Sequence, residues 1–233
     1  MGKDLIQQRR GRGSPSYRRH SFSSVGEARM QSRGGAKVLD IIHSYMHSAP
    51  LARVEYEDGE HGLIIATEGL RTGQLIQIGA DAQLELGNCL PLKAMPEGSI
   101  IFNIESRPGD GGRFVRASGG FARIVGKTGE MVLVQLPSKK RKAFNPMCQA
   151  TLGVAAGGGR PEKPFLKAGK RFHRVQAKDK YWPSVSGTAM NAVDHPFGHK
   201  RTSRKGRPTI APKNAPPGRK VGMLRPRHTG RNK

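Results

Sequence analysis

ARVEYEDG at residues 52–59, followed by GLIIA at residues 62–66, decides the fold of this 233-residue chain. Apolar and charged residues alternate over residues 52–57, a period of two that predicts a strand with one face in water. Asp58 and Gly59 both tolerate positive φ and supply a tight turn. Residues 62–66 then form the returning strand, so the stretch predicts an antiparallel hairpin.

Short apolar runs surround this hairpin at a similar spacing. They lie at residues 36–42, 75–78 and 84–86. Five short strands separated by turn residues are typical of a small closed barrel. The sequence therefore predicts a β-barrel of the OB-fold type over residues 36–95.

A second group of strands follows Pro91 and Pro96, which mark a boundary. The predicted strands are residues 99–104, 114–118, 121–125, 131–136, 143–144 and 150–154. A turn is expected at residues 127–130 and a basic loop at residues 137–142. The arrangement resembles an SH3-like barrel over residues 96–160, so the fold class is mainly β with little helix.

The positive charge lies outside these predicted barrels. The chain carries a formal net charge of +24. Residues 1–37 have a net charge of +7 and residues 166–233 of +16, whereas residues 38–137 have a net charge of −4. Segments this basic and this poor in apolar residues cannot form a core and are ordered by a polyanion. Residues 1–35 and 161–233 are therefore predicted to be extended basic arms threaded into RNA.

Several other classes of protein fit the composition less well. The net charge implies nucleic acid or an anionic membrane surface as the partner. No run approaches the roughly 18 apolar residues of a membrane span. The Arg- and Ser-rich start resembles an organelle transit peptide, but Gly11, Gly13 and Pro15 break any amphipathic helix there. Cys89 and Cys148 are far apart and are predicted to be buried thiols in a reducing compartment. No cofactor or metal site is predicted.

Residues 120–128 end in Gly126-Lys127-Thr128, like a phosphate-binding loop. That motif needs four residues between its glycines, and this segment has five. The motif also opens a helix, whereas the residues after Thr128 predict a turn and a strand. A β-hairpin is the better interpretation.

Two features of the C-terminal part have alternative interpretations. Gly157-Gly158-Gly159 before Arg160 is either a flexible linker or a backbone surface for RNA, and nearby lysines such as Lys163 and Lys167 favour RNA. Trp182 lies in a region too polar for a core. It either stacks on an unpaired base or packs against the adjacent barrel.

The pair Asp194-His195 has the residue types of general acid–base chemistry. A lone His beside an Asp is more often a structural hydrogen-bonded pair, and no nucleophile or metal cluster accompanies it. Pro196 biases the residue before it away from helical geometry. We therefore expect an extended or turned segment that presents the His195 ring, with Asp194 as a local partner.

GTAMNAVDHPFG at residues 187–198 closely resembles a signature of the second universal protein family of the large ribosomal subunit. Further segments resemble the archaeal–eukaryotic branch of that family: QRRGRG (8–13), PGDGG (108–112), KPFLKAG (163–169), APPGRKVG (215–222) and RHTGR (227–231). The resemblance spans essentially the whole chain in order.

The resemblance implies an OB-fold followed by an SH3-like barrel, and a cytoplasmic, non-catalytic protein of the large subunit. Its implied partners are large-subunit ribosomal RNA, other ribosomal proteins, and the small subunit across the subunit interface. It also implies roles in subunit association, tRNA binding and organisation of the peptidyl-transferase region, the last at His195. The predicted RNA-binding residues are Arg9, Arg10, Arg12, Arg160, Lys163, Lys167, Trp182, Gly187, Met190, Asn191, Asp194, His195, Arg219, Lys220, Arg227 and Arg231.

The chain departs from the family pattern at two places. Phe197 stands where the bacterial branch has a second histidine, so a two-histidine mechanism does not carry over. His199-Lys200-Arg201 interrupts the family's glycine run.

Two rival functions are a general nucleic-acid-condensing protein, which the arms alone permit, and an RNA-processing enzyme that uses Asp194 and His195.

Overall fold

The computed structural model describes residues 2–18, 24–199 and 208–226. The chain divides into two units. His20–Leu166 form one unit, here called the β body, and Met1–Arg19 with Lys167–Lys233 form the other, here called the basic unit.

One sheet of ten strands runs through the described part of the β body. The strand order is β3-β2-β1-β4-β5-β10-β6-β7-β8-β9, so the predicted mainly β class is confirmed. The strands are β1 (Gly34–Ile42), β2 (Leu51–Tyr56), β3 (His61–Ile65), β4 (Leu75–Ile78), β5 (Cys89–Pro91), β6 (Ile100–Phe102), β7 (Ala122–Thr128), β8 (Met131–Gln135), β9 (Arg141–Phe144) and β10 (Gln149–Leu152).

The predicted central hairpin is formed by β2 and β3. Their antiparallel register pairs Leu51 with Ile65 and Val54 with Gly62. Ala52, Val54 and Tyr56 are buried while Arg53 is exposed, because alternate side chains of a strand point to opposite faces. Leu51 points to the other face and is buried in a separate apolar cluster. A Cβ at Gly62 would lie 2.6 Å from the Tyr56 ring, so glycine allows the ring to cover β3.

The second hairpin joins β7 and β8 and confirms that residues 120–128 are no phosphate-binding loop. β7 runs on to Thr128, which pairs with Met131. The turn is therefore shorter than expected. The register shifts between Ile124 and Gly126, which marks an irregularity in β7.

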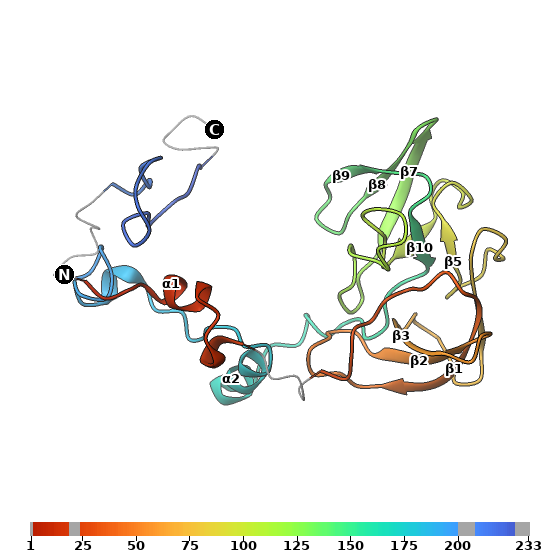
Figure 1. Cartoon of the computed structure of the whole chain (residues 1–233), viewed down its shortest axis with the longest axis horizontal. Coiled ribbons are helices and arrows are strands. Elements are labelled where there is room, and N and C mark those ends of the chain that lie inside the picture. Colours follow the sequence, from red (N-terminus) through yellow and green to blue (C-terminus); the bar gives the residue numbers. More distant parts are fainter. Residues whose placement is uncertain (1, 19–23, 200–207, 227–233) are drawn as a thin grey trace. The chain divides into compact units, whose positions relative to one another are not determined.

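β5 and β10 join the two groups of strands into one sheet. Ile78 of β4 pairs in parallel with Cys89 of β5, and β5 pairs antiparallel with β10. In Figure 1 the orange strands β1–β3 and the green strands β7–β9 form two separate groups. Each group has its own apolar core, and a third cluster around Leu51 and Phe102 lies between them. The assignment of the two groups to OB-fold and SH3-like barrels stays a prediction.

Two predicted strands are wrong. Residues 84–86 lie in a loop, with Leu84 and Leu86 exposed, and the strand is instead β5, whose residues are all buried. Residues 114–118 form only an isolated bridge, between Phe114 and Ile104. Val115 has φ of 55°, which a continuous strand does not allow.

The β body begins before residue 36. Ala28 and Met30 are buried. The Arg29 N–H donates to the carbonyl of Leu63 at 2.9 Å, and the Met30 N–H to that of Gly111 at 3.1 Å. The last part of the expected N-terminal arm therefore packs on the body.

A buried carboxylate organises the PGDGG loop. Glu105 is 2% exposed. It accepts hydrogen bonds from the backbone N–H groups of Gly109 at 3.1 Å, Gly111 at 3.1 Å and Gln149 at 2.9 Å. These donors satisfy a charge that burial alone would strongly disfavour.

Both cysteines are free and buried, as predicted. Cys89 Sγ lies 3.1 Å from Thr151 Oγ1. Burial raises the pKa of the Cys89 thiol to about 12, so it is inert near neutral pH.

Candidate nucleic-acid interface

The basic unit contains helices where an extended arm was expected. They are α1 (Ile6–Gly11) and α2 (Ala168–Ala177), with the 3-10 turns η1 (Pro15–Tyr17) and η3 (Gly187–Ala189). In α2, Phe172 and Val175 are three residues apart and share one face. The prediction of a fully extended C-terminal arm is therefore wrong at α2, because tertiary contacts support a helix too short to be stable alone.

The N-terminal segment contacts residues 179–194 within the basic unit. The Lys3 N–H donates to the carbonyl of Val193 at 2.8 Å, and Arg10 Nη2 donates to that of Asp179 at 3.0 Å. Leu5 is 7% exposed. Sequence reasoning missed this association, since contacts between residues so far apart in the chain leave no local signal.

The His195 ring is held by its neighbours. Its Nδ1 accepts the Phe197 N–H at 3.0 Å, and the two rings lie 5.1 Å apart. Because Nδ1 is an acceptor, the ring proton of the neutral form is on Nε2. Burial lowers the pKa of His195 below its ordinary value. Near neutral pH the ring is therefore uncharged and offers an Nε2–H donor.

Asp194 is not the partner of His195 that was expected. Its Oδ1 lies 3.8 Å from Lys3 Nζ. The carboxylate thus pairs with the other end of the chain instead of the imidazole. The expectation was wrong because adjacent residues in a turn direct their side chains apart.

Backbone hydrogen bonds shape the segment before His195. The Asn191 carbonyl accepts from the N–H groups of Asp194 at 3.0 Å and His195 at 3.2 Å, and the Met190 carbonyl accepts from His199 at 3.1 Å. Asn191 is exposed and Met190 half-buried. This turn fixes where the imidazole is presented, as expected of the segment.

Most of the Arg and Lys residues of the basic unit that are predicted to bind RNA lie at its surface. Arg10 is half-buried, and the exposed members are Arg9, Arg12, Lys167, Arg219 and Lys220. Arg12 pairs with Asp4, and Lys220 Nζ donates to the carbonyl of Lys213 at 3.1 Å. Arg227 and Arg231, like Lys200 and Arg201, lie outside the described residues.

Trp182 is half-buried in the basic unit. The guanidinium of Arg171, from α2, lies 5.4 Å from the centre of its ring. This cation–π contact orients the indole. The adjacent Tyr181 and Phe172 of α2 are exposed aromatic side chains.

Two of the predicted RNA-binding residues, Arg160 and Lys163, lie in the β body. Arg160 Nε donates to Ser118 Oγ at 3.0 Å, and Lys163 is exposed. A Cβ at Gly119 would lie 2.7 Å from Gly158 Cα, so the glycine run packs closely on a neighbouring loop and is more than a linker. Lys142 was expected in the basic loop but belongs to β9. Its Nζ lies 3.8 Å from the centre of the Phe114 ring, a contact that the predicted site omitted.

Within residues 2–18, 24–199 and 208–226, no three His, Cys, Asp or Glu side chains gather as a metal site. None of the helices described is long and apolar enough to cross a membrane.

A mainly β body combined with a unit rich in exposed Arg and Lys defines the class of RNA-binding proteins. Two family models match the chain: the RNA-binding N-terminal domain of ribosomal proteins L2 over residues 3–78, and the C-terminal domain of ribosomal proteins L2 over residues 85–218.

Curated relatives match almost the full chain. The large ribosomal subunit protein uL2 of Methanocaldococcus jannaschii is 52% identical, with 99% of each chain covered. Those of Methanothermobacter thermautotrophicus and Archaeoglobus fulgidus are 48% and 47% identical, with 100% and 99% of each chain covered. The chain belongs to the L2 (uL2) family of large-subunit ribosomal proteins.

Proposed function

We propose that this chain is a structural constituent of the cytoplasmic large ribosomal subunit, where it binds large-subunit RNA and other ribosomal proteins. The charge of the basic unit is the observation that carries this proposal. Residues 1–19 and 167–233 contain 24 Lys and Arg against three Asp and Glu. Such a unit neutralises phosphates and releases counterions from RNA.

The same unit contributes more than charge. We propose that its glycines let the RNA backbone approach closely and that its arginines offer bidentate donors to phosphates. The two strand groups of the β body, with a boundary near Pro96, act as two folded platforms. We propose that the platforms and the basic unit together hold separate RNA helices in place.

We further infer that His195 positions RNA and transfers no proton. Its Nδ1 is occupied by the Phe197 N–H, and Asp194 faces Lys3. The remaining Nε2–H is a single donor for a phosphate or a 2′-hydroxyl. These contacts support a protein with no catalytic activity of its own. The proposed place near the peptidyl-transferase region rests on the resemblance of the GTAMNAVDHPFG segment to the ribosomal family. Contributions to tRNA binding and to association with the small subunit belong to the same proposal.

Sedimentation tests the central proposal. The tagged chain should sediment with large subunits from a cell lysate and remain with them at moderate salt. It should also prefer structured ribosomal RNA to duplex DNA at physiological salt, unlike a general nucleic-acid condenser. An RNA-processing enzyme would instead cleave or modify labelled RNA with turnover. Sedimentation only with bulk DNA, or not at all, would contradict the proposal.

A further inference from the structure

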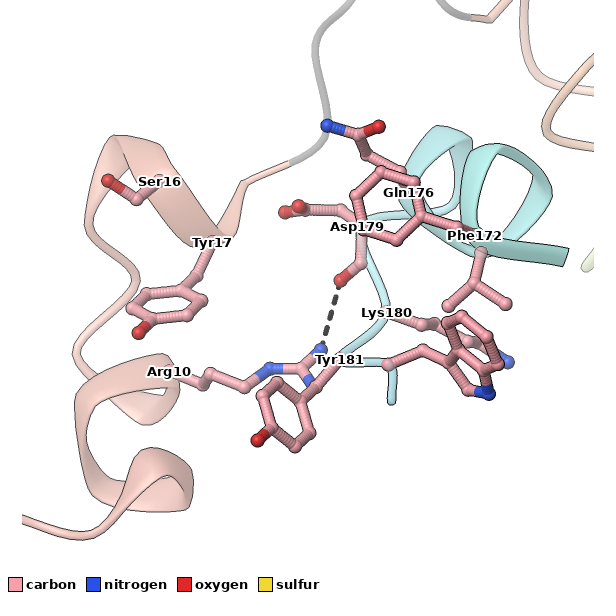
Figure 2. Close-up of a pocket in the computed structure, with 10 residues that line it drawn as sticks. Arg10, Ser16, Tyr17, Phe172, Gln176, Asp179, Lys180 and Tyr181 are labelled. Atoms are coloured by element: carbon pink, nitrogen blue, oxygen red, sulfur yellow. Dashed lines mark hydrogen bonds between the residues drawn. The ribbon is translucent and has the colours of Figure 1, made fainter. Parts of the chain in front are cut away.

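An aromatic pocket lies in the basic unit between the N-terminal segment and the end of α2. Its volume is about 240 Å³, less than the roughly 300–1,000 Å³ of pockets for drug-sized ligands. Tyr17 comes from η1, Phe172 from α2, and Tyr181 and Trp182 from the segment that follows α2 (Figure 2). The size and the aromatic lining suit one flat ring system.

The pocket also has cations at its edge. Arg10 and Lys180 both line it. The bond from Arg10 Nη2 to the carbonyl of Asp179, dashed in Figure 2, holds α1 against the segment after α2. A ring bound between these segments therefore has positive charge beside it, which suits the phosphates attached to a nucleobase.

Asp179 is the unusual member of this lining. The basic unit has three carboxylates, and two of them are ion-paired: Asp4 with Arg12, and Asp194 with Lys3. Oδ2 of Asp179 is buried and has no hydrogen-bond partner among the residues that the structure describes. In Figure 2 its carboxylate extends from the end of α2 toward the segment with Ser16 and Tyr17.

The location of Asp179 at the end of α2 gives no structural reason for a negatively charged side chain there. The residue follows the C-cap of α2 with φ of 50°, a conformation that Asn adopts as well as Asp. A negative charge at the C-terminal end of a helix is unfavourable because the helix dipole is negative there. An Asn at this position would end the helix without the unfavourable interaction between a carboxylate and the helix dipole.

A carboxylate that faces RNA is repelled by phosphates, so its partners are hydroxyl or N–H donors. A pocket lined by aromatic rings suits a base, and the donors that a base offers are its N–H groups. Guanine alone has two adjacent donors on its Watson–Crick edge, N1–H and N2–H, which match the two carboxylate oxygens. In adenine, cytosine and uracil an acceptor lies next to the donor and repels the second oxygen.

We propose that this pocket binds one unpaired guanine of the RNA, stacked on the aromatic side chains and hydrogen-bonded to Asp179. Arg10 and Lys180 contact the adjoining phosphates. The inference rests on the proposed RNA-binding function and assigns a base-specific site within it.

The test uses the full chain and RNA hairpins that differ only in one bulged nucleotide: guanine, adenine, cytosine, uracil or inosine, with a hairpin without a bulge for reference. Trp182 is the only tryptophan of the chain, so its fluorescence reports stacking in the pocket. Bulged guanine should bind about fivefold or more tightly than the other three standard bases and quench Trp182 most. Inosine, which lacks the N2 amino group, should bind more weakly than guanine.

The variant Asp179→Asn should bring bulged guanine within about twofold of the other bases, since a carboxylate acceptor is lost. Asp4→Asn is the matched control: it removes the same charge outside the pocket and should keep the preference. Equal binding of all bulges by the unaltered chain, or an inosine bulge as tight as guanine, would overturn the guanine site alone. Failure to bind any hairpin or large-subunit RNA would overturn the proposed function with it.

Discussion

A Cβ atom at Gly187 would lie 2.4 Å from Cε1 and 2.5 Å from Nδ1 of His195. Glycine at this position is therefore what leaves room for the imidazole ring. The φ of Gly187 is not in the left-handed region, so the requirement comes from the ring and not from the backbone. Within the GTAMNAVDHPFG segment, the position of the His195 ring therefore depends on the missing side chain of Gly187.

Gly187→Ala should displace the His195 ring and break its bond to the Phe197 N–H. We expect the basic unit to lose about 1–3 kcal/mol of stability, as overpacked sites do. Urea unfolding of the full chain, followed by amide signals of residues 187–198, measures the loss. The double variant Gly187→Ala with His195→Ala removes the clashing atoms, so its loss should be smaller than the sum of the single losses. Strict additivity would show that the ring is not the obstacle.

His195→Gln keeps an acceptor for the Phe197 N–H and a donor for RNA, but it cannot titrate. Large subunits reconstituted with this variant should assemble and retain most peptidyl transfer. His195→Ala removes both groups and should impair assembly or activity. A Gln variant that assembles normally yet loses transfer as fully as Ala would mean that titration of His195 matters.

The lowered pKa of His195 predicts a pH dependence of stability. Above its ordinary pKa of 6.5 the ring is neutral in both states and adds no slope. Below that pH the unfolded chain binds a proton that the folded chain resists, so stability falls as the pH falls. Urea unfolding between pH 7.5 and pH 5 should show this loss in the basic unit. The His195→Gln variant should show less of it, and an identical pH profile would contradict the assignment.

Glu105→Gln should destabilise the β body. An amide NH₂ would replace one of the oxygens that accept from Gly109, Gly111 and Gln149. The expected loss is about 2 kcal/mol or more, measured by denaturant unfolding. Glu97→Gln is the matched control, because the exposed Glu97 has one backbone donor, Lys127, and should cost about 0.5 kcal/mol or less. Similar losses for both variants would refute the role given to Glu105.

Salt dependence should separate the two units. RNA binding by the full chain should weaken steeply with salt, with a slope on the order of several phosphates. A fragment of residues 24–166 keeps the buried Ala28 and Met30 but loses 24 of the 41 Lys and Arg. Filter binding to large-subunit RNA from 50 to 500 mM salt should give the fragment a much flatter slope. A fragment as tight and as salt-sensitive as the full chain would place the main site on the β body.

Much of the β body was predictable from local patterns. The alternation in β2, the Asp58-Gly59 turn and the β7–β8 hairpin each depend on residues close together in the chain. The predictions failed at residues 84–86 and 114–118, where apolar composition suggested strands. There the long-range pairing of β5 with β10 and the left-handed backbone of Val115 decided the outcome.

The mainly β class, the charge of the arms and the motifs that place the chain in its family could be predicted from the amino-acid sequence, because they are properties of composition and short-range order. Only the tertiary structure decided that residues 2–18 pack on the C-terminal segment, that Asp194 pairs with Lys3, and that Asp179 joins four aromatic residues in one pocket. The contacts of Lys3 with Val193 and Asp194, and of Tyr17 with the pocket, join residues more than 150 positions apart. Their formation depends on the folded path of the chain, and no periodicity in the sequence encodes it.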